Sequence, residues 1–421
     1  MRSLIPWLFL VPWMVQAQEV PADPEPFEEK KLEWNGNLDA KYTAFHMDRG
    51  SALYKLQFVD AAASSAYLSQ YRIEPYLNAD YQTKDLGFHL KTHATYFSED
   101  EASVDLFEAY GSYNPSFNST LQAGKRVYNW GKGYAFNPVG YVNPVKDPEN
   151  PELAQAGLLS ASFEYVKSFS SPHLQTFSLH LVVVPPPPDL LNRYAEVQYT
   201  GFAVKGYVLL WDTDVDIIGF YRKDDRKQLG FDLSRNLREN IEIHAELSYS
   251  QGSSMYSITN GGLQEVRRDQ YSSLAGFRYL HESNTTIIAE YYHNGGGMNP
   301  AEFETYVGFL TNAVNSGNGV VARQALGTSQ RYFRGNTLMR DYLYVKLAIP
   351  EPFDWLYFTP SLYSIYNLND RSFLVSASLS YKPITNVEFI LWPTILTGTE
   401  TSEFGGKMVR QRIEAWLRVY F

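Results

Sequence analysis

The stretch Ile241-Glu-Ile-His-Ala-Glu-Leu-Ser-Tyr249 places apolar residues at odd positions and polar residues at even positions. Successive side chains of a β-strand point to opposite faces, so this pattern predicts a strand with one face suited to lipid and the other to water. The end of the chain, residues 409–421, repeats the pattern, with Arg412 and Glu414 among its polar even positions. Alternation at two distant places indicates that it organises the whole chain.

The composition favours a membrane over a soluble setting for these strands. Phe, Trp and Tyr make up 15% of the 421 residues, and this excess is typical of barrels that place aromatic rings at both membrane interfaces. A soluble β-sandwich also alternates, but its strands are usually about five or six residues long. We therefore predict an all-β fold, a transmembrane antiparallel up-and-down β-barrel.

Charge and motifs argue against several function classes. The formal net charge of −10 disfavours a nucleic-acid partner, which would require a basic surface, and the absence of Cys excludes disulfides and Cys-ligated metals. The sequence contains no Gly-x-Ser-x-Gly elbow, His-Glu-x-x-His helix or phosphate loop. We predict no catalytic residues, no cofactor and no metal site.

The N-terminus predicts export from the cytoplasm. Residues 1–17 have a basic start, an apolar run from Leu4 to Val15 and a small residue, Ala17, at the end, as in a cleaved signal peptide. Residues 18–31 are acidic and Pro-rich, as in a periplasmic tail, which leaves 32–421 as a single barrel domain. The predicted location is the outer membrane of a Gram-negative-type cell.

Counting alternating stretches between turn signals predicts 18 strands, with 16 as the alternative count. The predicted strands cover 32–46, 68–81, 86–97, 103–113, 118–128, 159–169, 173–183, 195–212, 214–222, 227–235, 240–250, 270–281, 285–293, 339–349, 354–366, 371–382, 385–395 and 408–421. With both termini periplasmic, every even-to-odd connection is a short turn, and every long insertion falls on the external side. The 251–269 segment is one of these insertions.

The third external segment, Asn129–Leu158, is too long for a simple hairpin and too apolar to extend freely into water. We predict that it folds into the lumen as a constriction; the alternative is that it packs over the rim. The candidate constriction residues are Tyr134, Phe136, Tyr141, Asp147 and Glu149.

The seventh external segment, His293–Met339, predicts a helix. Asn299 suits the N-cap, Pro300 the first helical position and Glu302 the third, in the manner of a capping box. Its predicted apolar face comprises Phe303, Val307, Leu310 and Val314. The helix is predicted either to cover the pore mouth or to pack against neighbouring loops.

Charged side chains at inward positions predict a wet lumen of mixed sign. The candidate pore-lining residues are Arg72, Glu74, Arg126, Glu164, Glu242, His244, Glu246, Arg278, Glu290, Arg410, Arg412, Glu414 and Arg418. The three arginines of the last strand predict an anion track. The structural alternative is that opposite charges inside the barrel pair with each other.

Two stretches carry a resemblance to known proteins. Residues 411–421, which end in Phe421, resemble the closing strand that outer-membrane barrels present to the barrel-assembly machinery. Residues 124–138 are similar to segments of porin-like barrels, including relatives of alginate-export channels. The resemblance implies contact with membrane lipids and lipopolysaccharide, and with that machinery.

The predicted function is an outer-membrane channel that passes small hydrophilic solutes, with the transported solute unassigned. The first alternative is a largely occluded barrel that serves an export or envelope-assembly pathway. The third is an outer-membrane enzyme.

Overall fold

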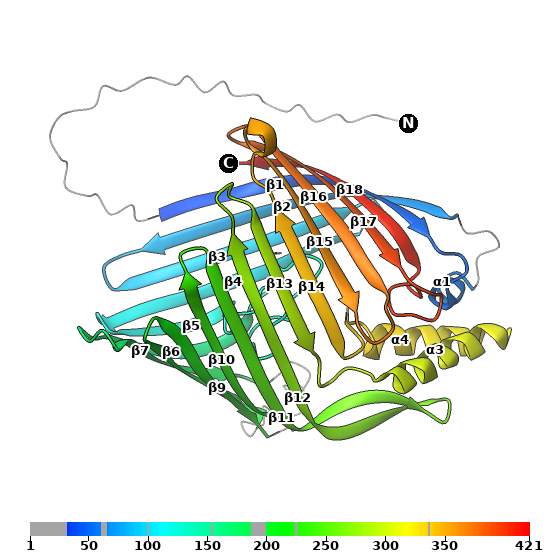
Figure 1. Cartoon of the computed structure of the whole chain (residues 1–421), viewed down its shortest axis with the longest axis horizontal. Coiled ribbons are helices and arrows are strands. Elements are labelled where there is room, and N and C mark those ends of the chain that lie inside the picture. The colour runs from blue at the N-terminus through cyan, green and yellow to red at the C-terminus, as the bar shows by residue number, and fades with distance from the viewer. Residues whose placement is uncertain are drawn as a thin grey trace, which may run out of the picture.

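The alternating stretches form strands that close into one barrel (Figure 1). The computed structural model describes residues 32–59, 65–98, 101–152, 155–186, 199–223, 226–335 and 337–421. The predicted signal peptide and acidic tail, residues 1–31, lie outside the described residues.

Within that part of the chain, eighteen antiparallel strands pair in sequence order, and β18 pairs with β1 to close the barrel. The strands are β1 (Leu32–Met47), β2 (Tyr67–Gln82), β3 (Leu86–Phe97), β4 (Ala102–Ser116), β5 (Ser119–Arg126), β6 (Leu158–Ser168), β7 (Leu174–Val184), β8 (Gly201–Leu210), β9 (Thr213–Arg222), β10 (Arg226–Arg238), β11 (Ile241–Thr259), β12 (Gly262–Leu280), β13 (Thr286–His293), β14 (Asp341–Ala348), β15 (Phe358–Asn367), β16 (Phe373–Ile384), β17 (Val387–Thr397) and β18 (Val409–Tyr420). The predicted all-β barrel and its count of 18 are confirmed.

The alternation separates the two surfaces of the wall. On β11, His244 and Glu246 are buried inside the barrel, whereas Leu247 is 57% exposed on the outside. Ile217 on β9 and Ile413 on β18 are likewise exposed on the outside. A barrel with apolar side chains outside and polar ones inside matches the solvents on the two sides of a membrane-embedded wall.

The predicted strand map differs most from the structure in two places. The predicted strand 195–212 begins only at Gly201, and residues 195–198 lie outside the described residues. The 251–269 segment is not a loop, because β11 and β12 continue past an irregularity after Ser250 and pair as far as Thr259 and Gly262. This extension carries polar residues on both faces, so the alternation that marks a lipid-facing strand is missing there.

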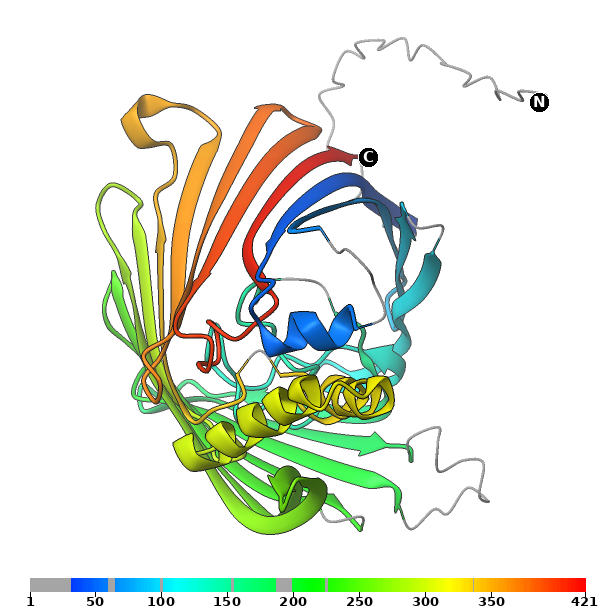
Figure 2. The same cartoon turned by 90° about the vertical axis from the view of Figure 1, so that its right-hand side faces the viewer.

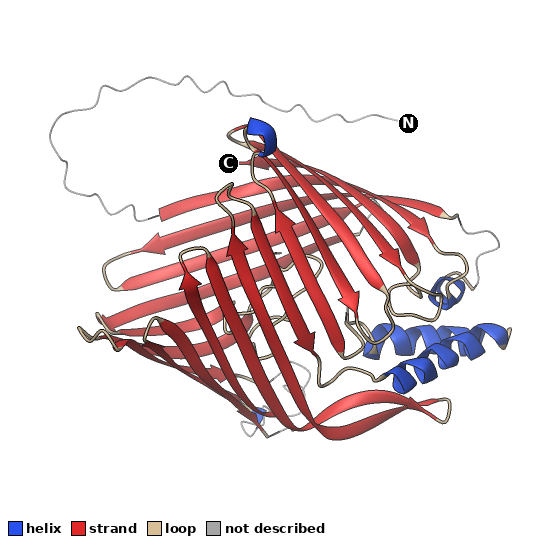
Figure 3. Cartoon of the chain, viewed as in Figure 1, coloured by secondary structure: helices blue, strands red, loops and turns tan. Residues whose placement is uncertain are grey.

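Helices gather at one end of the barrel, which we call the helical end, and the short even-to-odd turns lie at the other, the turn end (Figures 1 and 3). The helices are α1 (Ala52–Gln57), α3 (Pro300–Asn315) and α4 (Gly319–Tyr332), and a short 3-10 helix, η2 (Pro352–Asp354), lies at the turn end. In Figure 2, which looks at the helical end, α1, α3 and α4 lie across part of the opening. In the described part of the chain, no helix has the length and apolar character needed to cross a bilayer.

The predicted start of α3 is confirmed, and its buried face is displaced. The Asn299 side chain accepts from the Glu302 N–H, and the Glu302 carboxylate accepts from the Asn299 N–H. The fully buried positions are Phe303, Tyr306, Leu310 and Ala313, so Val307 and Val314 lie at the edge of the face instead. The face turned because α3 packs on α1 and α4 as well as on the end of β11.

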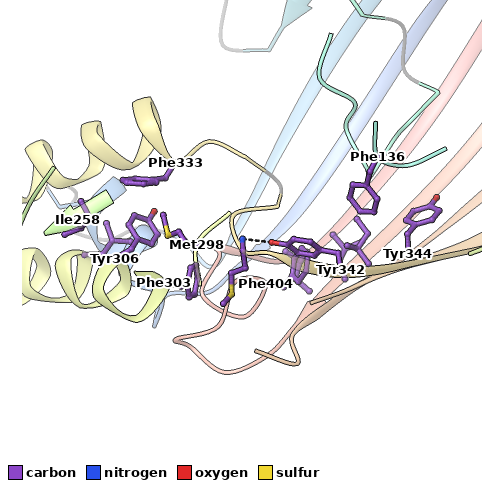
Figure 4. Packing of buried hydrophobic residues seen from close by; sticks show 14 of the residues in the cluster. Phe136, Ile258, Met298, Phe303, Tyr306, Phe333, Tyr342, Tyr344 and Phe404 are labelled. Carbon is purple, nitrogen blue, oxygen red and sulfur yellow. Dashed lines mark hydrogen bonds between the residues drawn. The ribbon is translucent and has the colours of Figure 1, made fainter. Parts of the chain in front are cut away.

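The apolar cluster at the helical end continues from these helices down the inner wall (Figure 4). Phe303 and Tyr306 of α3 pack with Phe333 after α4, and the same cluster reaches Tyr342 and Tyr344 on β14. The helices are therefore fixed to the barrel by continuous packing.

Candidate functional site

The segment between β5 and β6, residues 127–157, lies against inward-facing side chains of the wall. Its residues Tyr128, Trp130, Val139 and Val142 are buried in one cluster with inward residues of β7, β8 and β9. The wall residues of that cluster are Val182, Val184, Ala203, Ile218 and Phe220. The segment thus packs on inward-facing side chains of β7, β8 and β9.

Two buried carboxylates hold the backbone of the segment. Glu246 on β11 accepts hydrogen bonds from the backbone N–H groups of Lys132 and Gly133, each at 2.6 Å, and of Val139 at 3.2 Å. Glu290 on β13 accepts from the N–H groups of Tyr134 and Ala135. A carboxylate that accepts several backbone N–H groups replaces the water that both partners lose on burial.

Glycine is required where this backbone approaches the wall. Gly131 has φ of +95°, and a Cβ there would lie 2.8 Å from a Glu246 carboxylate oxygen and 2.2 Å from Asn137 Oδ1. A Cβ on Gly133 would lie 2.2 Å from the Phe136 carbonyl oxygen. Both glycines permit a close approach that a side chain would block.

A lysine adds an ionic contact to the same wall. Lys132 Nζ lies 3.0 Å from Asp216 on β9 and 3.9 Å from Asp232 on β10, and both aspartates are fully buried. Burial opposes the charged form of Lys132, but the two carboxylates outweigh it and raise the pKa of the ammonium group.

The far end of the segment contacts the other side of the wall. Glu149 lies 3.0 Å from Arg412 on β18, and Glu152 lies 3.1 Å from Lys346 on β14. The Tyr134 hydroxyl donates to Glu152 at 2.5 Å and accepts from Lys346. Residues 127–157 therefore contact inward side chains from β7 round to β14, and again on β18.

The predicted constriction residues take different positions on this segment. Phe136 is buried and stacks on Tyr292 with ring centroids 4.5 Å apart, and Tyr141 bonds Ser248 at 2.8 Å. Asp147 accepts from the Glu149 N–H. Phe136 and Tyr141 thus pack against the wall, whereas Tyr134 and Glu149 border cavities.

Charged residues of β1, β2 and β18 form one continuous chain of ion pairs with the segment. Consecutive members alternate in sign at separations between 2.6 and 3.5 Å: Arg418, Asp39, Lys41, Glu74, Arg72, Glu414, Arg412 and Glu149. Four positive groups face four negative ones. Arg410, the third arginine of the predicted anion track, pairs with Asp48 at 2.8 Å. The arginines of β18 are therefore neutralised by neighbours, as the structural alternative expects.

The other pore-lining candidates fall into two groups. Glu242 pairs with Arg278 at 2.8 Å, and His244 lies 3.0 Å from Glu290, so these four gather on β11, β12 and β13. The second group lies elsewhere on the wall. Arg126 stacks on the Tyr128 ring, and Glu164 lies opposite His180 in the register of β6 and β7.

Three cavities surround the segment. A mouth cavity of about 320 Å³ lies at the helical end and includes Glu149 and Arg412 in its lining. A large cavity of about 840 Å³ and a second of about 600 Å³, which we call the tryptophan cavity because Trp392 and Trp416 border it, lie toward the turn end. Tyr134, Glu152 and Lys346 border both of the latter, so this cluster stands between them.

Several residues of this site were not predicted from the sequence. Asp39 and Lys41 lie two positions apart on β1, so both face the same side, and the apolar–polar alternation of this strand could have identified them as inward-facing. Trp392 and Trp416 also lie at inward positions, but aromatic residues were attributed to the membrane interfaces as a class. Among the described residues, no group of three or more His, Cys, Asp or Glu is placed to hold a metal ion.

Comparisons with known proteins give structural neighbours alone. No family model and no curated protein matches the chain. The Pseudomonas aeruginosa protein OccK11 (OpdR) superposes with a TM-score of 0.52 at 11% identity, over 92% of this chain and 96% of its own. OccK2 (OpdF) of the same organism gives 0.54 at 10% identity, over 92% and 98%. OccK2 has also been solved in complex with glucuronate. With its apolar outer surface and these neighbours, the chain has the fold of a porin-type outer-membrane β-barrel.

Proposed function

We propose that the barrel is an outer-membrane channel for small hydrophilic solutes, and that residues 127–157 form its constriction. The observation that carries this proposal is the polar interior of the barrel. Cavities of about 840 and 600 Å³ lie there on the turn-end side of the segment, which is fixed to the wall at both of its ends. Wide cavities next to a narrow, side-chain-lined crossing are the arrangement by which a barrel selects solutes by size and polarity.

Charge pairing supports a channel of weak ion selectivity. Selectivity for one sign requires rings or ladders of that sign, and the inner wall at β18 carries alternating signs instead. The local resemblance of residues 124–138 to segments of alginate-export channels is consistent with a channel and assigns no particular solute. The proposal assigns no catalysis to the chain.

The experiment is conductance of the purified barrel in planar lipid bilayers. Discrete open steps of constant size are expected. A matched variant in which residues 138–150 are replaced by a short Gly-Ser linker should give larger steps, because the far anchor at Glu149 is removed. Silence from both proteins, with folding verified by heat-modifiable migration, would contradict a channel.

One observation favours the second candidate, an occluded barrel. Glu149, which pairs with Arg412, borders both the mouth cavity and the tryptophan cavity, and α1, α3 and α4 cover part of the mouth. An occluded barrel would be silent as the wild type and would open only when the segment is shortened. The same pair of proteins therefore separates the two functions.

We also infer that the final strand is recognised by the barrel-assembly machinery. Phe421 bonds Gly36 through both backbone groups at 3.0 Å, and its side chain is 54% exposed on the outside. An exposed terminal aromatic on the closing strand is accessible to a partner before the barrel closes.

A further inference from the structure

The tryptophan cavity combines aromatic rings with hydroxyl and amide groups. Rings from four strands follow one another along its wall: Tyr344 and Tyr363 have centroids 6.0 Å apart, Tyr363 and Trp392 6.4 Å, and Trp392 and Trp416 5.5 Å. Tyr134 of the 127–157 segment continues this row at 5.9 Å from Tyr344. All five rings border the cavity.

The rings differ in how much surface they keep free. Tyr344 and Tyr363 are 1% and 4% exposed, and Lys41 Nζ covers one face of Trp416 at 3.9 Å from its centroid. Trp392 is only half-buried, and its indole N–H donates to Ser376 at 2.7 Å, which fixes the ring orientation. Among the four strand residues of the row, Trp392 is therefore the most exposed, and its orientation is fixed by a hydrogen bond.

Opposite and beside the rings, the cavity is lined by neutral hydrogen-bonding groups. These groups are Asn37, Asn78, Asn150, Thr359, Ser361, Ser378 and Ser380. Hydroxyl and amide groups both donate and accept, so they suit a solute that carries many hydroxyl groups.

The charges around the cavity balance. Three cationic residues and three anionic residues border it: Lys91, Lys346, Arg418, Glu149, Glu152 and Glu388. Lys346 already pairs with Glu152, and Arg418 pairs with Asp39 in a bidentate contact. At Lys346 and Arg418, an anionic solute would have to displace these carboxylates, whereas a neutral solute would not.

We propose that the tryptophan cavity binds a neutral sugar of one or two pyranose units, with Trp392 as the stacking platform. One face of a pyranose ring presents C–H groups, which pack on the electron-rich face of an aromatic ring, and its rim presents hydroxyls to polar side chains. The volume of about 600 Å³ lies within the range of small-ligand cavities. This inference rests on the channel function proposed above, and it specifies the class of solute that the channel would carry.

The test uses maltose and glucuronate as probes, because both contain a pyranose ring and only the second carries a charge. Binding to the detergent-purified full-length barrel is measured by titration calorimetry. Saturable binding of maltose is expected, with glucuronate at least tenfold weaker. Absence of maltose binding at millimolar concentration, or tighter binding of glucuronate, would overturn the proposal.

Two variants localise the site. Trp392→Ala should weaken maltose binding at least tenfold, and Trp392→Phe should restore part of it, because a ring face returns. The matched control is Trp355→Ala, which removes an exposed tryptophan next to η2, away from the cavity. Equal maltose binding by Trp392→Ala and wild type, with both folded by heat-modifiable migration, would refute the site.

Bilayer recordings keep this inference distinct from the channel itself. Maltose should interrupt open steps of the wild type and of Trp355→Ala, and interrupt those of Trp392→Ala far less. Open steps that maltose never interrupts would overturn the sugar site and leave the channel intact. Maltose binding in solution without any open step would keep the sugar site and overturn the channel.

Discussion

The carboxylate of Glu149 lies 3.0 Å from the guanidinium group of Arg412. The first belongs to the segment between β5 and β6, and the second to β18, with β1 to β4 between these strands around the wall. The same arginine also contacts Glu414 at 2.9 Å. This ion pair, together with that of Glu152 and Lys346, thus fixes the far end of the 127–157 segment to the wall.

Breaking this pair should widen the path. In Glu149→Gln the charge of this side chain is lost and Arg412 keeps Glu414 as its partner. Of the two ion pairs named above, only that of Glu152 and Lys346 then still holds the far end of the segment. We expect a conductance increase of roughly twofold or less, because the near end stays anchored, in single-channel recordings. Glu265→Gln, which changes an exposed carboxylate on the β11–β12 extension, is the control. Identical step sizes in all three proteins would contradict this role for Glu149.

Removing the near anchor should cost stability. In Glu246→Ala three backbone N–H groups lose their acceptor, and each unpaired buried group costs about 1–3 kcal/mol unless water replaces the carboxylate. We expect a lower temperature for loss of the compact form on unheated gels and larger current noise. Glu242→Ala is the comparison. Glu242 lies on the same face of β11 as Glu246, but its carboxylate pairs with the exposed Arg278 of β12. An unchanged transition in Glu246→Ala would mean that the segment does not depend on this anchor.

Glu403 should make the helical end sensitive to pH. Burial raises the pKa of this carboxyl group to about 7, with Asp370 adding to the effect, although Tyr342, the Leu338 N–H and Lys407 favour the charged form. The folded pKa exceeds the unfolded value, so its contribution to stability is full below about pH 4.5 and is lost as pH rises through 7.

The measurement is hydrogen exchange of the 398–408 loop at pH 5 and pH 8, corrected for intrinsic rates. Protection should fall at pH 8 in the wild type and change less in Glu403→Gln, which stays neutral. Equal pH dependence in both proteins would show that another group titrates.

Deleting Phe421 should impair assembly. The deletion removes two hydrogen bonds to Gly36 at 3.0 Å and the ring that lies 6.0 Å from Trp34. We expect several-fold less heat-modifiable protein in the outer membrane, whereas Phe421→Tyr should assemble normally because it keeps both the backbone and the ring. Normal levels of the truncated protein would exclude a role for the last residue.

Local patterns in the sequence predicted the fold well. The strands, the short turns and the capping box at Asn299 each follow from residues close together in the chain. The sequence did not predict the β11–β12 extension. Residues 251–269 carry polar residues on both faces, so they lack the apolar–polar alternation from which the strands were predicted.

The pairings inside the barrel could not be predicted in the same way. Arg418 and Asp39 meet only because β18 closes on β1 in one register, which no local pattern specifies. Glu246 was predicted to face inward, but its partners are backbone N–H groups, which leave no side-chain signature in the 127–157 segment.

The closing ladder has a consequence for how quickly the barrel can form. Among the described strands, every ladder joins neighbours in sequence except that of β1 and β18, which brings Gly36 to Phe421. The hairpins can form as soon as their two strands exist, but closure must wait for the last residue and bears the loop entropy of nearly the whole chain. Until that moment both edges of an eighteen-stranded sheet are unpaired, so closure is the step at which folding competes with aggregation.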